Sequence, residues 1–249
     1  MISVCMATYN GETFLKKQID SILSQLGNDD ELIISDDGSI DKTISIINEI
    51  NDQRIKLYHH SSAVPKNKKK FDLHTINHYI SFNFLNALNK AKGDYIFFSD
   101  QDDIWYSYKI EKCIDVLNNC DMVLSNFSLI NNTDQVIINK YLKKRRFINN
   151  YIIRSFSPGY SGCAMAFRKE MLKYILPFPK DMSCGHDNWA GICVAKFGKL
   201  SFIDEPLFQH RIHEKNNSGF CKKSPNNILQ KINWRTSMFF NILMRKRKK

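Results

Sequence analysis

The stretch Tyr95-Ile96-Phe97-Phe98-Ser99-Asp100-Gln101-Asp102-Asp103 organises the fold that this sequence predicts. An apolar run typical of a buried strand leads directly into three carboxylates within four positions. Carboxylates this close repel one another, and burying them together costs free energy. A cation between them would offset that cost, and ligands that are all oxygen favour Mg²⁺ or Mn²⁺. A solvated acidic turn is the alternative that this stretch alone leaves open.

Two earlier apolar strands also end in polar residues. Residues 2–6 run into Ala7-Thr8-Tyr9-Asn10-Gly11, and residues 31–35 run into Asp36-Asp37-Gly38-Ser39. Apolar residues at helical spacing follow each turn, and a third strand is expected at 55–58. This alternation predicts a parallel sheet with right-handed crossovers. Because ligands bind beyond the carboxyl ends of such strands, we expect turns 7–12, 36–39 and 100–103 to converge.

The second half of the chain predicts further strands and helices and two more polar sites. Residues 139–158 are basic and irregular, which predicts a loop. Asp187 begins an apolar helix, where a carboxylate serves either as a cap or as a general base that takes a proton from a hydroxyl. A loop at 209–219 carries His210, Arg211 and His213, which could hold a metal or a diphosphate.

The composition predicts one large globular domain, residues 1–220, followed by a C-terminal helix and tail, residues 221–249. No apolar run approaches the roughly 20 residues that span a bilayer. The first six residues lack the features of an export signal. The seven cysteines are scattered without a CxxC pair, which favours reduced thiols in a cytoplasmic protein.

The net charge of +11 is concentrated in three clusters, and the remainder of the chain is close to neutral. Such clusters attract anionic membranes or polyanions, although solubilising surface charge explains the two internal clusters equally well. The third cluster follows an amphipathic helix, which favours membrane contact over packing on the domain. The clusters are Lys66 with residues 68–70, residues 143–146, and residues 245–249.

Taken together, the motifs resemble the family 2 glycosyltransferases of the GT-A fold, including bacterial rhamnosyltransferase-like enzymes, over roughly residues 1–220. The order and spacing of the motifs are more specific than any one of them. The matching segments are residues 7–11, 33–43, 99–105, 162–168, 186–189 and 210–213.

The resemblance implies a Rossmann-like, mostly parallel α/β sheet and an inverting, metal-dependent transfer from a nucleoside-diphosphate sugar. It implies that Asp187 is the catalytic base, and that Asp102, Asp103 and His213 hold Mn²⁺ or Mg²⁺. It further implies a set of donor nucleotide contacts, with Asp37 at the base. That set is Thr8, Asn10, Glu12, Asp37 and Asp100.

The resemblance also implies a UDP- or dTDP-linked donor and a lipid-linked saccharide acceptor in the synthesis of surface polysaccharide such as O-antigen or capsule. The protein would then be cytoplasmic and peripheral at the inner face of the membrane. The His-Asp-Asn-Trp segment at 186–189 departs from many relatives, which leaves the acceptor open. A segment of the Q-x-x-R-W type is absent, which favours single addition over polymerisation.

Two other classes of protein would explain part of this sequence. A metal-dependent sugar nucleotidyltransferase would carry a glycine-rich basic loop after the first strand, but residues 7–12 hold one glycine and no lysine. A non-catalytic polyanion-binding protein would suit the basic charge. Acids in its cleft would repel the phosphates of a nucleic acid, so no nucleic-acid partner is expected.

Overall fold

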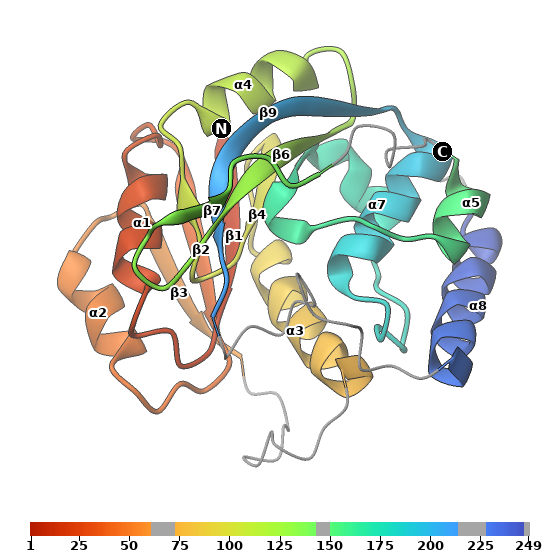
Figure 1. Cartoon of the computed structure of the whole chain (residues 1–249), viewed down its shortest axis with the longest axis horizontal. Coiled ribbons are helices and arrows are strands. Elements are labelled where there is room, and N and C mark those ends of the chain that lie inside the picture. The colour runs from red at the N-terminus through yellow and green to blue at the C-terminus, as the bar shows by residue number, and fades with distance from the viewer. Residues whose placement is uncertain (61–72, 143–149, 214–227, 247–249) are drawn as a thin grey trace.

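The computed structural model describes residues 1–60, 73–142, 150–213 and 228–246. Within this part of the chain, nine strands form one mixed sheet with helices on both faces (Figure 1). The strands are β1 Ile2–Thr8, β2 Glu31–Asp36, β3 Ile55–His59, β4 Tyr95–Ser99, β5 Ile104–Trp105, β6 Met122–Ile130, β7 Val136–Ile138, β8 Met165–Arg168 and β9 Leu200–Arg211. The helices are α1 Leu15–Leu23, α2 Thr43–Ile50, α3 Leu73–Leu88, α4 Lys109–Leu117, α5 Tyr151–Phe156, α6 Leu172–Ile175, α7 His186–Phe197 and α8 Ile228–Met244.

The amino-terminal half of the sheet is parallel, in the order β3-β2-β1-β4. Thr8 at the end of β1 is in register with Asp36 at the end of β2, and Met6 of β1 is in register with Ser99 at the end of β4. The turns that follow β1, β2 and β4 therefore lie at one edge of the sheet. The predicted alternation of strands and helices, and the predicted convergence of these turns, are confirmed.

The other half of the sheet is antiparallel where β8 lies between β4 and β6, and β9 then runs parallel to β6. The prediction that residues 209–211 lie in a loop is wrong. β9 continues to Arg211 because its backbone pairs with β6 as far as Ile130. β5 pairs antiparallel with β9, with Ile104 opposite Gln209. Residues 100–103, called the acid turn below, lie between β4 and β5 and are therefore next to the end of β9.

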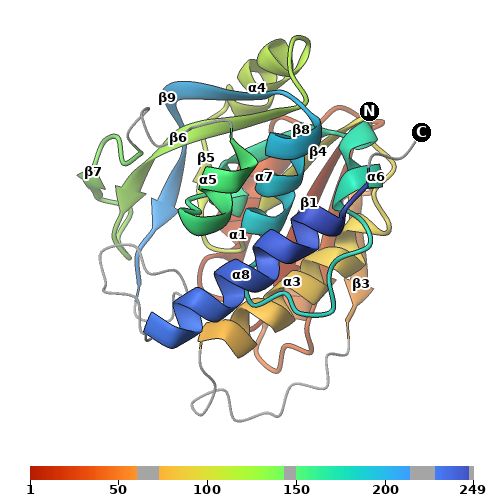
Figure 2. The same cartoon turned by 90° about the vertical axis from the view of Figure 1, so that its right-hand side faces the viewer.

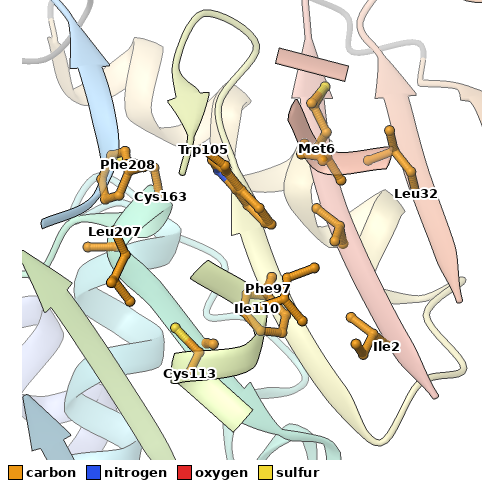
Figure 3. Packing of buried hydrophobic residues seen from close by; sticks show 14 of the residues in the cluster. Ile2, Met6, Leu32, Phe97, Trp105, Ile110, Cys113, Cys163, Leu207 and Phe208 are labelled. Atoms are coloured by element: carbon orange, nitrogen blue, oxygen red, sulfur yellow. The ribbon is translucent and has the colours of Figure 1, made fainter. Parts of the chain in front are cut away.

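The central strands are buried on both faces, which explains their continuous apolar sequences. Alternate side chains enter different clusters, with Val4 and Phe97 on one side of the sheet and Cys5 and Phe98 on the other. Figure 3 shows part of the first cluster, in which Phe97 packs near Trp105. The six described cysteines are buried and free.

The predicted loop at 139–158 contains a helix, α5, in its described part. The side chain of Asn150 caps this helix by accepting hydrogen bonds from the backbone N–H groups of Ile152 and Ile153, at 3.0 and 3.2 Å. The rings of Phe156 in α5 and Phe239 in α8 lie 5.3 Å apart, so tertiary packing supports a helix too short to be recognised from its sequence.

Helix α8 packs on the domain, beside α5 and α7 (Figure 2). Met238 and Ile242 of α8 are buried in the second hydrophobic cluster. No helix in the described part of the chain is long and apolar enough to cross a membrane. The expected domain boundary at residue 220 and the basic residues at 66–70 and 143–146 lie outside the described residues, as does most of the 209–219 segment.

Candidate active site

Side-chain hydrogen bonds join the turns after β1 and β2. Thr8 Oγ1 donates to Asp36 Oδ2 over 3.0 Å. Asn10 Oδ1 and Glu12 Oε2 accept from backbone N–H groups of the β2–α2 turn, at 2.9 and 3.0 Å. Three of the predicted nucleotide-binding residues therefore hold the second turn against the first. Their direct contact with a nucleotide stays a prediction.

The two adjacent acids at the end of β2 have different surroundings. Asp36 is buried and accepts the backbone N–H groups of Gly38 and Ser39 at 3.0 and 2.8 Å, which closes the turn. Gly38 takes a positive φ of 77°, which favours glycine. Asp37, the predicted contact of the nucleotide base, lies instead 3.2 Å from Nδ1 of His60. The Asp36 side chain is thus occupied by Thr8 and by its own turn, whereas that of Asp37 contacts His60.

The acid turn after β4 is fastened to the turn after β1. The Gln101 side chain accepts the N–H of Tyr9 at 2.9 Å and donates to the carbonyl of Tyr9 at 3.1 Å. A Cβ atom at Gly11 would lie 2.5 Å from Gln101 Oε1, so a side chain there would displace this amide. These contacts hold the predicted donor-binding turns together at the sheet edge.

Asp102 and His213 form a close pair, as the predicted metal site requires. Asp102 Oδ2 lies 2.7 Å from His213 Nε2, and both side chains keep partial exposure, 15% and 12% respectively. This separation is that of a hydrogen bond, so the two atoms would have to move apart to share a cation, but a carboxylate oxygen and an imidazole nitrogen are both accepted ligands of divalent metals. The pair therefore fits the expected metal.

Asp103 is directed inward, where it meets His210 rather than His213. Its Oδ1 lies 2.8 Å from His210 Nδ1 and accepts the backbone N–H of Arg211 at 3.2 Å. Burial by itself would lower the pKa of His210, but the neighbouring Asp103 carboxylate raises it to about 9. Burial would raise the pKa of Asp103, which the His210 imidazolium holds below its usual range. A shared metal for Asp103 and Asp102 stays a prediction.

Asp100 lies close to the charged side chains of Asp102, Asp103 and His210. Burial, followed by the charges of Asp103 and Asp102, raises the pKa of Asp100 to about 7. Lys109, fully buried, donates to the carbonyl of Cys163 at 2.6 Å and supplies positive charge behind the acids. This lysine was not predicted, because in the sequence it occupies an ordinary position on the amphipathic helix α4.

Arg211 anchors the acid turn from behind. Its Nε donates to the backbone carbonyl of Asp102 at 3.0 Å, and its Nη1 lies 2.6 Å from Asp134 Oδ1. The guanidinium also lies over the ring of Phe14, at 4.3 Å from the centroid. Arg211 thereby connects the acid turn to helix α1 and to the β6–β7 turn.

Asp187 is in the first turn of α7 but is not its cap. Gly185, with a φ of 86°, occupies the N-cap position, and no side chain bonds there. Asp187 Oδ1 accepts the N–H of Asn188 at 2.7 Å. Burial raises the pKa of Asp187 to about 7, which suits a general base near neutral pH. Asp187 does not occupy the N-cap position, but as an acid in the first turn that accepts a first-turn N–H it also suits the helix terminus, so its role as a base stays a prediction.

His186, next to Asp187, is a packing residue. Its ring stacks on that of Phe84 with centroids 3.8 Å apart, and burial lowers its pKa to about 3. The imidazole is therefore neutral at physiological pH, and it packs among the rings of Phe84 and Phe98. In the sequence, His186 is part of the 186–189 motif. The motif does not indicate whether its side chain packs in the core or takes part in binding.

Two consecutive residues connect the base to the acid turn. A Cβ at Gly162 would lie 2.8 Å from His186 Nε2 and 3.6 Å from Asp187 Cβ, so the chain passes directly beside the start of α7. The next residue, Cys163, lies 4.0 Å from His210 Nδ1 through its Sγ. Since His210 contacts Asp103, the start of α7 and the acid turn border the same loop.

Comparisons with known sequences agree with this arrangement. Residues 3–176 match the model of the family described as "Glycosyl transferase family 2". The chain is 32% identical over 225 residues to the dTDP-rhamnosyl transferase RfbG of Shigella flexneri, covering 86% of this chain and 73% of that protein. It is 30% identical over 165 residues to the Escherichia coli protein named UDP-Glc:alpha-D-GlcNAc-diphosphoundecaprenol beta-1,3-glucosyltransferase WfgD, covering 64% and 57%.

An uncharacterized glycosyltransferase of Nostoc sp. is 27% identical over 224 residues, covering 87% of this chain and 66% of that protein. The chain therefore spans about two thirds of the length of these relatives. None of the three is named as a nucleotidyltransferase or as a nucleic-acid-binding protein.

Solved structures show the same fold. Staphylococcus aureus TarS 1–349 in complex with UDP-GlcNAc superimposes with a TM-score of 0.69 at 16% identity, covering 96% of this chain and 66% of that one. A mannosyltransferase from Pyrobaculum calidifontis in complex with GDP-Man and Mn²⁺ gives a TM-score of 0.61 at 16% identity, covering 100% and 65%. The predicted GT-A fold is confirmed.

Proposed function

Because the chain belongs to glycosyl transferase family 2, we propose that it transfers a sugar from a nucleoside-diphosphate sugar to a hydroxyl group of a saccharide acceptor. The observation that carries this proposal is the position of Asp187. Its carboxylate, with a pKa raised to about 7 by burial, borders the same loop as the acid turn. This neighbourhood supports a base and a diphosphate site that act on one bound donor.

The donor would lie across the turns after β1, β2 and β4. Asp37 is the proposed contact of the nucleotide base, in a pocket shaped by Thr8, Asn10 and Glu12, with Asp100 facing the sugar nucleotide. A UDP- or dTDP-linked donor agrees with relatives whose names include dTDP-rhamnosyl and UDP-Glc.

Asp102 and His213 are the proposed ligands of Mn²⁺ or Mg²⁺. When bound, the cation would neutralise charge on the leaving nucleoside diphosphate. Arg211 holds the backbone of Asp102 through its Nε, so this ligand is fixed from behind before the donor arrives. The mannosyltransferase that contains GDP-Man and Mn²⁺ supports a metal for this fold, but at 16% identity it does not identify the ion used here.

Asp187 is the proposed base of an inverting displacement. Its carboxylate would take the proton of the acceptor hydroxyl as that oxygen forms a bond to the anomeric carbon, and the bond from that carbon to the diphosphate breaks. Attack from the face opposite the leaving group inverts the anomeric centre. Burial keeps the basicity of Asp187 above that of an exposed carboxylate.

The proposed acceptor is a lipid-linked saccharide of bacterial surface polysaccharide synthesis, such as O-antigen or capsule, at the cytoplasmic face of the membrane. One relative is named for a diphosphoundecaprenol-linked substrate. Helices α5 and α8, adjacent through Phe156 and Phe239, carry exposed apolar residues and no acidic residue. These residues are Ile152, Ile153, Phe156, Ile228, Leu229, Ile232, Phe240, Leu243 and Met244. An apolar surface with basic residues at its end suits an anionic bilayer.

Calorimetric titration tests the donor site. UDP, dTDP and GDP are titrated into the wild type and into Asp102→Asn, Asp187→Asn and the exposed control Asp181→Asn, with and without Mn²⁺. We expect one nucleotide to bind in a metal-dependent manner to every protein except Asp102→Asn. Asp187→Asn should retain binding but lose turnover. Equal loss of affinity in Asp102→Asn and Asp187→Asn would contradict their separate roles, and a wild type that binds no nucleotide would contradict the proposal.

Sedimentation with vesicles tests the membrane contact. Binding to vesicles with anionic lipid should exceed binding to neutral vesicles, and Phe240→Ser with Leu243→Ser should reduce it. Ile40, 84% exposed in the β2–α2 turn, provides the control substitution Ile40→Ser at a site remote from α5 and α8. Equal binding of all variants would contradict a role for this surface.

A further inference from the structure

Two side chains of the acid turn lie close to two side chains from distant parts of the chain, and the proposed reaction uses only Asp100 among the four. One possible ligand atom from each of Asp100, Asp103, Cys163 and His210 lies within 4.8 Å of the others. Asp103 is fully buried, and its Oδ2 has no hydrogen-bond partner in the described structure. An unpaired carboxylate oxygen inside a protein costs free energy, which a bound cation would offset.

The separations of these atoms suit a first-row transition metal. Ligand distances of about 2.3 Å for Zn–S and about 2.0–2.1 Å for Zn–N place sulfur and nitrogen roughly 3.6 Å apart in a tetrahedral site. Cys163 Sγ lies 4.0 Å from His210 Nδ1, which in turn lies 2.8 Å from Asp103 Oδ1. The corresponding nitrogen–oxygen separation in a zinc site is about 3.3 Å. Shifts of about half an ångström would therefore bring these three side chains to tetrahedral separations, and Asp100, whose ligand atom lies within 4.8 Å of theirs, would move in to supply the fourth ligand.

The charges of these four side chains also allow a divalent cation to replace bound protons. Without a metal, protonated His210 faces Asp103, and the Lys109 ammonium contacts the carbonyl of Cys163. Coordination by His210 Nδ1 and Cys163 Sγ would release one proton from each residue to solvent. Where the Asp100 carboxylate is already ionised, a divalent cation then replaces two protons, and the buried net charge is unchanged. This equality matters because a buried net charge is penalised by desolvation.

We propose that Asp100, Asp103, Cys163 and His210 form a second metal site, separate from Asp102 and His213, that binds a thiophilic divalent cation of the Zn²⁺ class. A thiolate ligand selects Zn²⁺ or Co²⁺ over Mg²⁺ and Mn²⁺. Asp100 keeps partial exposure, so the cluster is in contact with solvent through this residue. A consequence that rests on the proposed function is that Zn²⁺, by engaging Asp100, would weaken donor binding, whereas Mn²⁺ would support it.

Cobalt spectroscopy tests the site without any sugar donor. Co²⁺ is titrated into metal-free protein, and thiolate-to-cobalt charge-transfer absorption is recorded. Cys221 lies outside the described residues, so it is replaced by serine in all samples. The matched control is Cys120→Ser, because the Cys120 thiol donates to backbone carbonyls, which a hydroxyl can also do. We expect saturation at one equivalent in the parent and in Cys120→Ser. Cys163→Ser should lose the band, and its Zn²⁺ affinity should fall at least ~10-fold.

A parent without the band, or a Cys163→Ser variant that folds and keeps it, would overturn the proposal. X-ray absorption at the zinc edge provides a second measurement on the unaltered chain, in case the variant does not fold. One sulfur ligand at about 2.3 Å is expected, and a shell of nitrogen and oxygen alone would overturn the site. Neither measurement needs a nucleotide, so their failure would leave the transferase proposal unaffected.

Discussion

Replacement of Asp187 by asparagine should stabilise the protein while it abolishes turnover. Asp187 is an acid whose pKa is raised by burial, so the folded state opposes its ionisation. Asparagine has nearly the same shape, and its Oδ1 can still accept the N–H of Asn188. The substitution therefore removes the charge and retains the main hydrogen bond.

The magnitude follows from the two pKa values. The carboxyl group changes from 3.8 when unfolded to about 7 when folded. Folding is favoured most below about pH 4, where the acid is neutral in both states, and this contribution is lost as the pH rises to about 7. At 1.36 kcal/mol for each pKa unit, the wild type loses at most ~4 kcal/mol over this range. Because Asp187 keeps some exposure, screening by water should bring the measured value nearer ~2 kcal/mol.

Urea denaturation between about pH 4 and pH 8 measures this effect. The free energy of unfolding of Asp187→Asn should equal that of the wild type near pH 4 and exceed it by about 2–4 kcal/mol near pH 8. The control is Asp181→Asn, an exposed carboxylate close by in the sequence that accepts the N–H of Ser183 at 2.9 Å. The control should stay within about 0.5 kcal/mol of the wild type throughout.

A different result would refute the electrostatic reasoning. If Asp187→Asn were equally stable or less stable near pH 8, with an unchanged urea m-value, the carboxylate would not be destabilised by the fold. Its raised pKa would then be incorrect, and the argument for Asp187 as a base tuned to neutral pH would fail. A pH-independent gain in stability would instead indicate a packing effect of the amide.

Three further outcomes follow from the site and the core. In the wild type, kcat should fall about tenfold for each pH unit below about 7, because Asp187 must be ionised to act as a base; a flat profile between about pH 5 and 7 would exclude that role. Asp103→Asn leaves the buried His210 charge without its partner and should lower the free energy of unfolding, measured with urea, by ~3–5 kcal/mol. Asp102→Asn, at the partly exposed pair with His213, should lower it less. Equal losses would show that the pair of Asp103 and His210 is not the stronger one. Gly93→Ala would place a Cβ 2.5 Å from the backbone nitrogen of Ser3 and should reduce stability by ~1–3 kcal/mol. Gly159→Ala, with a nearest atom at 3.8 Å, should reduce it by less than ~1 kcal/mol. Similar melting temperatures for the two variants would contradict the close packing at Gly93.

The parallel half of the sheet could be predicted because its signals are local. Each strand is an apolar run that ends in polar residues, and each crossover helix has its own apolar spacing. The rule that parallel strands place their carboxyl ends at one edge then brings Thr8, Asp37 and Asp100 together without any coordinates. Family motifs extended this prediction to Asp102, Asp187 and His213.

Helices α5 and α8 show where local patterns were insufficient. The six residues of α5 are too few for a helical period to be recognised, and this helix depends on its cap and on the ring contact between Phe156 and Phe239. For α8, the sequence presented an apolar face, but which of its residues are buried depends on the surface that α5 and α7 offer. Met238 and Ile242 face the domain, whereas Phe240 and Leu243 remain exposed.

The amino-acid sequence by itself therefore determined the order of strands and helices, the sheet edge where the polar turns converge, and the acids that gather there. Tertiary structure alone decided how those acids divide their roles. Asp102 meets His213 and Asp103 meets His210 because β5 pairs with β9 in one particular register. The raised pKa values of Asp100 and Asp187 likewise come from burial by segments distant in the chain. Burial and charge pairing are properties of neighbours in space, which a local sequence pattern does not contain.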